Sequence, residues 1–87
     1  MLEILIAYSD KNQLKDLVDY TTDTITIKTY CENIFKERKN AFKVKGSVAA
    51  KLTPLVVIKE DNKIIKAFYK EEFEDPIKEF NNWMKNV

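Results

Sequence analysis

The chain has no histidine, one cysteine, one glycine and two prolines among its 87 residues. Without histidine it lacks the commonest general base and the commonest metal ligand of proteins. A single cysteine excludes an intramolecular disulfide, and a lone thiol suits a reducing compartment. So few glycines and prolines leave little room for sharp turns, and we therefore expect most residues to lie in regular elements.

Long apolar runs and an excess of charge of one sign are missing as well. No apolar run approaches the roughly 20 residues that a membrane span needs, and the apolar segment after Met1 contains Glu3, unlike a signal peptide. The formal net charge is +1, which gives no overall field to attract nucleic acid or a membrane. We therefore expect one small cytoplasmic domain over residues 1–87, with neither a membrane nor a nucleic acid as its partner.

What is present is an ordinary globular composition, 45% hydrophobic and 33% charged. Continuous apolar runs and period-two alternation predict four strands, at residues 2–8, 24–30, 55–58 and 63–69. Apolar spacing at i, i+3 and i+4 predicts three helices, at residues 10–21, 32–43 and 74–86. The order β-α-β-α-β-β-α predicts an α/β fold with a mixed four-stranded sheet and helices on both faces.

Two loops carry the local signals that bear on a site. Ser9 and Asp10 both offer N-caps for the first helix, and Asp10 with Gln13 forms a capping-box pair. Ser9 has no histidine or other evident base to activate it, so we interpret it as a cap. At the other loop, Thr53-Pro54 directly precedes the third strand, a normal place for a proline.

This element order, in so short a chain, resembles the minimal thioredoxin/glutaredoxin fold. Residues 52–84 carry the closest likeness, with Thr53-Pro54 before a strand, a charged turn, a second strand and a closing helix. In that family a proline opens the third strand in the cis form, so the resemblance implies a cis Thr53-Pro54 bond.

The family's redox motif is absent. The resemblance places a Cys-x-x-Cys between the first strand and the helix after it, but residues 8–13 read Tyr-Ser-Asp-Lys-Asn-Gln and contain no sulfur. Dithiol exchange by the family's mechanism cannot occur there. The paired glycines that glutaredoxins use for glutathione are replaced by Phe68-Tyr69-Lys70-Glu71, so we expect no cofactor and no metal.

The first hypothesis is therefore a redox-inactive thioredoxin-like module that binds a protein or an extended peptide by β-augmentation. It requires a cis Pro54 and a groove that the protein's own side chains leave open. Size and composition also make the chain look like accessory proteins of bacteriophages or low-GC bacteria, and the host cytoplasm would then be its compartment. The resemblance implies a peptide-binding groove formed by Thr53, Pro54, Tyr8, Ser9, Asp10, Lys11 and Asn12.

Two alternatives stay open. Cys31 ends the second strand on the face of Ile25 and Ile27, which indicates a packing thiol, but it could instead serve a single-thiol oxidoreductase. A structural or assembly subunit is the other alternative, because the second strand is a candidate sheet edge.

A basic stretch completes the list of candidate surfaces. Six cations lie within sixteen residues, with Glu37 as the one acid among them; they are Lys36, Arg38, Lys39, Lys43, Lys45 and Lys51. Such a patch can attract an acidic segment or a phosphate backbone. Its aromatic residues are too few for a single-strand stacking platform, and a solvated helix face is the plainer interpretation.

Overall fold

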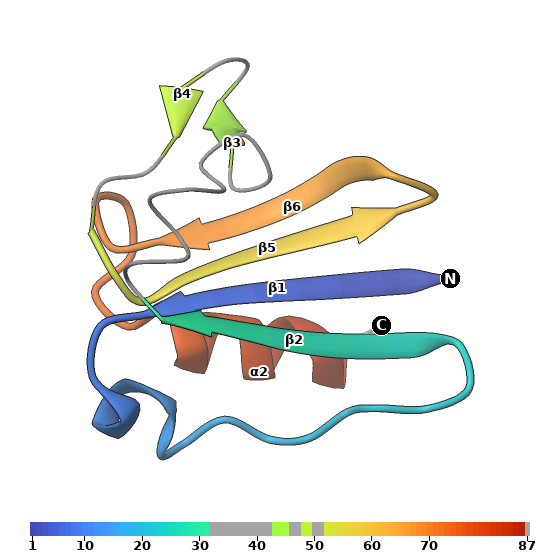
Figure 1. Cartoon of the computed structure of the whole chain (residues 1–87), viewed down its shortest axis with the longest axis horizontal. Helices are drawn as coiled ribbons and strands as arrows, with labels where there is room; N and C mark the ends of the chain where they lie inside the picture. The colour runs from blue at the N-terminus through green and yellow to red at the C-terminus, as the bar shows by residue number, and fades with distance from the viewer. Residues whose placement is uncertain (32–42, 46–47, 50–51, 87) are drawn as a thin grey trace.

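A computed structural model describes residues 1–31, 43–45, 48–49 and 52–86 of the chain (Figure 1). Four strands form one sheet, in the order β2-β1-β5-β6, and two short strands form a second. The helical elements of these residues are a 3₁₀ helix, η1, near the N-terminus and an α-helix, α2, near the C-terminus. The bounds are β1 (Leu2–Tyr8), η1 (Lys11–Leu14), β2 (Ile25–Cys31), β3 (Lys43–Lys45), β4 (Val48–Ala49), β5 (Leu55–Glu60), β6 (Lys63–Tyr69) and α2 (Pro76–Lys85).

The main sheet is mixed, as the sequence predicts. β1 pairs with β2 in parallel, and it pairs with β5 in antiparallel, so the two most apolar strands lie at the centre. β5 and β6 form the expected antiparallel hairpin. Its two turn residues, Asp61 and Asn62, have φ angles of 51° and 67°. Asp and Asn tolerate such left-handed backbone better than most residues, which suits a two-residue hairpin turn.

One face of the sheet packs against α2 (Figure 1). Alternate residues of the central strands point to this face, and their core includes Ile6, Val56, Phe68 and Phe80. Phe80 is fully buried and meets the Tyr20 ring edge to face, with the ring centroids 5.9 Å apart. Burial of these large side chains supplies the main driving force for docking α2 on the sheet.

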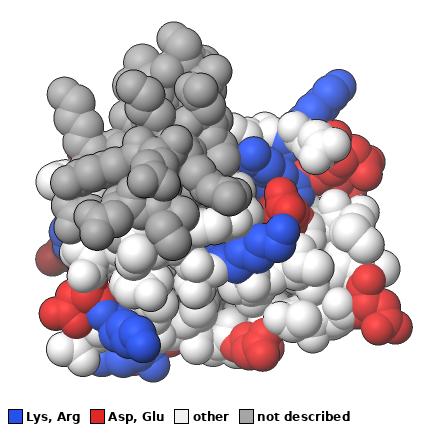
Figure 2. Space-filling view, viewed as in Figure 1, with Lys and Arg blue, Asp and Glu red and all other residues white. Residues whose placement is uncertain are grey.

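The opposite face is buried only at one end. Leu5, Ala7, Leu55 and Val57 form a smaller core there. Towards the start of β1, the same face carries Glu3, whose carboxylate lies 3.5 Å from the ammonium of Lys28 on β2. Figure 2 shows acidic and basic side chains interspersed over the part of this face that is not drawn in grey.

α2 lies within the predicted range of residues 74–86, but it begins two residues later, at Pro76, and ends one residue earlier, at Lys85. Asp75 caps it, because its carboxylate accepts a hydrogen bond from the Lys78 backbone N–H at 3.2 Å. Pro76 occupies the first turn, where its missing N–H is not needed. No helix among the described residues has the length and apolar character that crossing a bilayer requires.

The predicted helix over residues 10–21 is wrong. Only Lys11–Leu14 turn helically, and the chain from Lys15 to Thr24 is irregular. Asn81 of α2 supplies the reason, since its side chain donates to the Asp16 carbonyl at 2.8 Å and accepts from the Val18 N–H at 3.3 Å. Leu14, Leu17 and Tyr20 still pack on the α2-side core. The apolar spacing therefore predicted which side chains are covered, but not the backbone conformation.

The second predicted helix, over residues 32–43, lies outside the described residues except for Lys43, which is in β3. β3 pairs with β4 in antiparallel and lies close to β6. The fold class is thus α/β with a mixed four-stranded sheet and one α-helix among the described residues.

Candidate functional site

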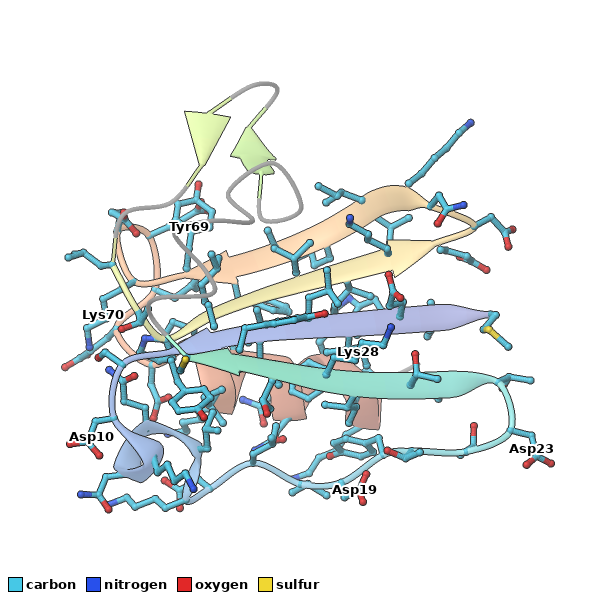
Figure 3. The ribbon with its side chains drawn as sticks, in the orientation of Figure 1. Asp10, Asp19, Asp23, Lys28, Tyr69 and Lys70 are labelled. Atoms are coloured by element: carbon cyan, nitrogen blue, oxygen red, sulfur yellow. The ribbon has the colours of Figure 1, made fainter. Side chains whose placement is uncertain are left out.

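Three loops meet at the end of the sheet where β1 and β2 finish and β5 begins. We call residues 8–13, 53–54 and 69–75 the loop end (Figure 3). The Thr53-Pro54 bond is cis, as the family resemblance implies, and Pro54 is buried. The Thr53 hydroxyl donates a hydrogen bond to the Ser9 hydroxyl at 2.9 Å, which ties the first loop to the second. Two of the predicted site residues, distant in sequence, are thereby in direct contact.

Gln13 makes a second link between these loops. Its carboxamide oxygen accepts from the Ser9 backbone N–H at 2.9 Å and from the Asp10 N–H at 3.4 Å. Its carboxamide nitrogen donates to the Thr53 carbonyl at 3.3 Å. The Thr53 carbonyl is the backbone group next to the cis proline, so a side chain of the protein itself occupies part of the predicted groove. The expectation that the protein's own side chains leave this groove open is therefore wrong at the Thr53 carbonyl.

The capping pattern within the first loop is partly as predicted. Asp10 is the N-cap of η1, and Asp10 with Gln13 forms the capping box. The Asp10 carboxylate accepts from the Asn12 N–H at 2.9 Å. The interpretation of Ser9 as the cap is wrong, because Asp10 takes that position and frees the Ser9 hydroxyl to accept from Thr53.

A groove of about 680 Å³ opens beside Pro54, between η1 and the start of α2. Asn12, Gln13 and Pro54 line one part of it, and Pro76 and Ile77 line another. Charges of both signs surround it, contributed by Lys15, Asp16, Lys70, Glu74, Asp75, Lys78 and Glu79. The groove is mixed in charge and open, which suits an extended polar chain better than a compact apolar ligand.

The end of β6 forms another wall of the loop end. Lys70 donates to the Glu74 carbonyl at 2.8 Å and so holds the short connection to α2 (Figure 3). A hydrogen bond with Glu72 raises the pKa of the Tyr69 phenol, with burial and nearby negative charge acting in the same direction. The Glu71 carboxylate accepts from the Leu52 N–H at 3.2 Å, just before Thr53.

The remaining predicted residues are distributed around this network. Tyr8 is half-buried at the end of β1, whereas Lys11 and Asn12 are exposed in η1. Asn12 lines the groove beside Pro54. The structure therefore brings Ser9, Asp10 and Thr53 together with Asn12 and Pro54 at one end of the sheet.

Cys31 lies nearer to the loop end than its place in the sequence indicates. It is half-buried and stands opposite Tyr8 in the parallel register of β1 and β2. The sequence alone put it a full element away from the family's redox position. Within the described ranges, no group of three or more Cys, Asp or Glu residues is arranged to hold a metal ion.

The basic stretch cannot be placed, because Lys36, Arg38, Lys39 and Lys51 lie outside the described residues. Lys43 and Lys45 belong to β3, of which only the backbone is described.

Gln13 is a site residue that was not among those predicted from the sequence. The capping box did predict that its side chain folds back on the loop. Its contact with Thr53 spans 40 residues of sequence, and only the pairing of β1 with β5 brings the two positions together. Searches against protein-family models, curated proteins and solved structures found no match for this chain.

Proposed function

We propose that the chain is a redox-inactive, thioredoxin-like module that binds an extended peptide segment at the loop end. The parallel first pair, the C-terminal antiparallel hairpin and the cis proline opening β5 support the likeness to that fold. The loop that would carry the redox motif contains no cysteine. Binding, rather than thiol exchange, is the activity this combination favours.

The observation that carries the proposal is the position of the Gln13 carboxamide. A carboxamide has the same donor and acceptor as a peptide group. Here the acceptor bonds the Ser9 N–H and the donor bonds the Thr53 carbonyl, from two segments 44 residues apart. An extended peptide that enters this end would offer the same pair of groups and take the place of Gln13.

Displacing the Gln13 carboxamide replaces its hydrogen bonds with peptide hydrogen bonds of the same kind, which makes the exchange feasible. The Gln13 side chain is partly exposed, and a neutral hydrogen bond contributes about 0.5–1.5 kcal/mol net. The peptide would continue along the groove beside Pro54, where Asn12, Pro76 and Ile77 offer further contacts. The mixed charges around the groove suit a segment that carries charges of both signs.

The test is selection from a phage-displayed library of random peptides, followed by affinity measurements on the enriched sequences. Gln13→Ala removes the competing carboxamide, so we expect it to bind these peptides about fivefold more tightly, the equivalent of roughly 1 kcal/mol. Asp10 still caps η1 in this variant. Asn62→Asp, in the hairpin turn at the far end of the sheet, should leave the affinity unchanged.

Absence of any enriched sequence would overturn the proposal. So would peptides that bind wild type and Gln13→Ala equally while shifting amide resonances away from Ser9, Asn12 and Thr53.

A further inference from the structure

The outer edge of β2 offers backbone groups that the described structure leaves unused. The Leu2 N–H donates to the Thr24 carbonyl at 2.8 Å, which fixes the phase of the parallel β1–β2 ladder. Alternate residues of a strand bond to the same neighbour. Thr26 and Lys28 therefore bond to β1, whereas Ile27 and Thr29 direct their N–H and C=O groups away from the sheet.

No described residue forms a hydrogen bond with these outward groups of Ile27 and Thr29. The preceding outward carbonyl, that of Ile25, accepts from the Thr22 N–H at 3.0 Å. The register of β2 against β1 runs without a bulge over all its residues. Such a regular edge without a proline is a template for another strand.

β6, the other edge of the sheet, is different. It carries a register shift opposite the Ile58–Lys59 step, and Lys63 and Lys66 are exposed along it. Bulges and lysines are the devices by which edge strands avoid pairing with other chains. β2 has one lysine, Lys28, whose ammonium already lies 3.5 Å from the Glu3 carboxylate.

We infer that β2 pairs in antiparallel with β2 of a second copy of this chain, about a two-fold axis at Thr29. Thr29 then faces Thr29 of the second copy, and Lys28 faces the second copy's Tyr30. Ile27 faces Cys31 of the second copy. The Thr29 pair is polar, the Lys28–Tyr30 pair is cation-aromatic, and the Ile27–Cys31 pair is apolar, so no like charges face each other. The main sheets of the two copies then form one continuous sheet.

The two-fold registers centred on Lys28 and on Ile27 are less favourable for identifiable reasons. An axis at Lys28 sets two ammonium groups directly opposite each other, which is destabilising. An axis at Ile27 pairs Thr29 with Ile25 of the second copy, whose carbonyl is already used by Thr22. Self-complementarity at Thr29 is what makes a second copy, rather than an unrelated strand, the occupant that fits this edge.

Cysteine cross-linking tests both the dimer and its register. Residues directly opposed in a hydrogen-bonded antiparallel pair have Cα atoms about 5.5 Å apart, within disulfide reach. Thr29→Cys in a Cys31→Ser background should form a covalent dimer on mild oxidation. Lys28→Cys in the same background is the matched control and should not, since its two copies would be offset by two residues along the strand.

Sedimentation velocity of the wild-type protein over a dilution series should show a reversible dimer. Thr29→Lys should be monomeric with an unchanged far-UV circular dichroism spectrum, because Thr29 is exposed and its side chain is not needed for folding. A wild-type protein that stays monomeric at its highest soluble concentration would overturn the inference. A dimer that cross-links through Lys28→Cys and not through Thr29→Cys would overturn it equally.

Discussion

At the loop end, side chains from segments 40 and 44 residues apart exchange hydrogen bonds through Gln13, Ser9 and Thr53. At the opposite end, which comprises residues 1–3, 22–28 and 59–63 and which we call the hairpin end, the long-range polar contacts outside the strand ladders are exposed ion pairs among the described residues. The N-terminal ammonium lies 4.0 Å from Asp61, and Lys28 lies 3.5 Å from Glu3. Both ends pack on the α2-side core, which includes Leu2 and Ile25 near the hairpin end and Ile6 and Phe68 near the loop end.

The two ends therefore differ in where specific long-range polar contacts are made, and most of these contacts lie at the loop end. A two-residue turn closes the hairpin end with backbone geometry alone. The loop end instead positions a carboxamide on the backbone carbonyl beside a proline. Hydrogen-bonded networks of this kind fix a particular geometry, which is what the proposed peptide site requires.

Phe80→Ala should have the largest effect, because it should destabilise both ends of the sheet together. Phe80 is fully buried beneath the sheet and packs on Tyr20, so truncation should lower the free energy of unfolding by about 3–5 kcal/mol. Amide hydrogen exchange should then accelerate at both ends together. Acceleration confined to one end would mean that the two ends do not share this core.

Asn81→Ala should destabilise the irregular segment between η1 and β2 without disturbing the sheet. It removes the bonds to the Asp16 carbonyl and the Val18 N–H that hold the irregular segment after η1. We expect a loss of about 1–2 kcal/mol in chemical denaturation and faster exchange at Val18. Asn82→Ala, at the exposed neighbouring position, is the matched control and should change little.

Gln13→Glu should have the next largest effect, and this effect should be confined to the loop end. The carboxylate still accepts from the Ser9 N–H but cannot donate to the Thr53 carbonyl, so we expect a loss of about 1 kcal/mol at neutral pH. Asn62→Asp changes the net charge equally at the hairpin end and should cost less. Equal losses in the two variants would show that the Gln13–Thr53 bond contributes nothing.

Glu3→Gln should have a smaller effect at the hairpin end. The Glu3 and Lys28 side chains are 37% and 56% exposed, and exposed ion pairs contribute about 0.2–1 kcal/mol or less. Raising the salt concentration should remove the difference between the variant and wild type. A larger loss of stability that persists at high salt would show that Glu3 and Lys28 do not form an ordinary exposed ion pair.

The titration of Tyr69 should show the smallest effect. Its hydrogen bond with Glu72 raises its pKa above the usual value of about 10. The unfolded phenol ionises first as the pH rises, so the associated stability is complete below pH ~10 and declines above it. The difference in phenolate absorbance between wild type and Tyr69→Phe isolates this group, and a midpoint at or below 10 would contradict the assignment.

Much of the sheet was predictable from the sequence because its signals are local. The continuous run of β1, the alternation of β2 and the turn residues Asp61 and Asn62 each specify their element directly. The helix after Asp10 was not predictable, since Asn81, from the far end of the chain, takes the backbone groups of Asp16 and Val18 that a helix would have paired. The apolar spacing predicted which side chains pack on the core, and Leu14 and Leu17 pack on it from the irregular segment.

The sequence predicted which residues form the candidate site better than it predicted the hydrogen bonds between them. The resemblance pointed to Thr53, Pro54 and the loop after Tyr8, and the capping box pointed to Gln13. That Gln13 reaches the Thr53 carbonyl depends on the antiparallel register of β1 and β5, which no local pattern encodes. Ser9 was assigned to a cap for the same reason, because its partner Thr53 lies 44 residues away.

The most direct measurement follows the side-chain amide protons of Gln13 by ¹⁵N NMR while a library-selected peptide is added. In the free protein they should exchange slowly with solvent, because the nitrogen donates to the Thr53 carbonyl. Our account predicts that peptide releases them to the position and exchange rate of a solvated glutamine, while the side-chain amide of Asn62 is unaffected. Saturation with peptide that leaves the Gln13 amide signals unmoved would contradict it.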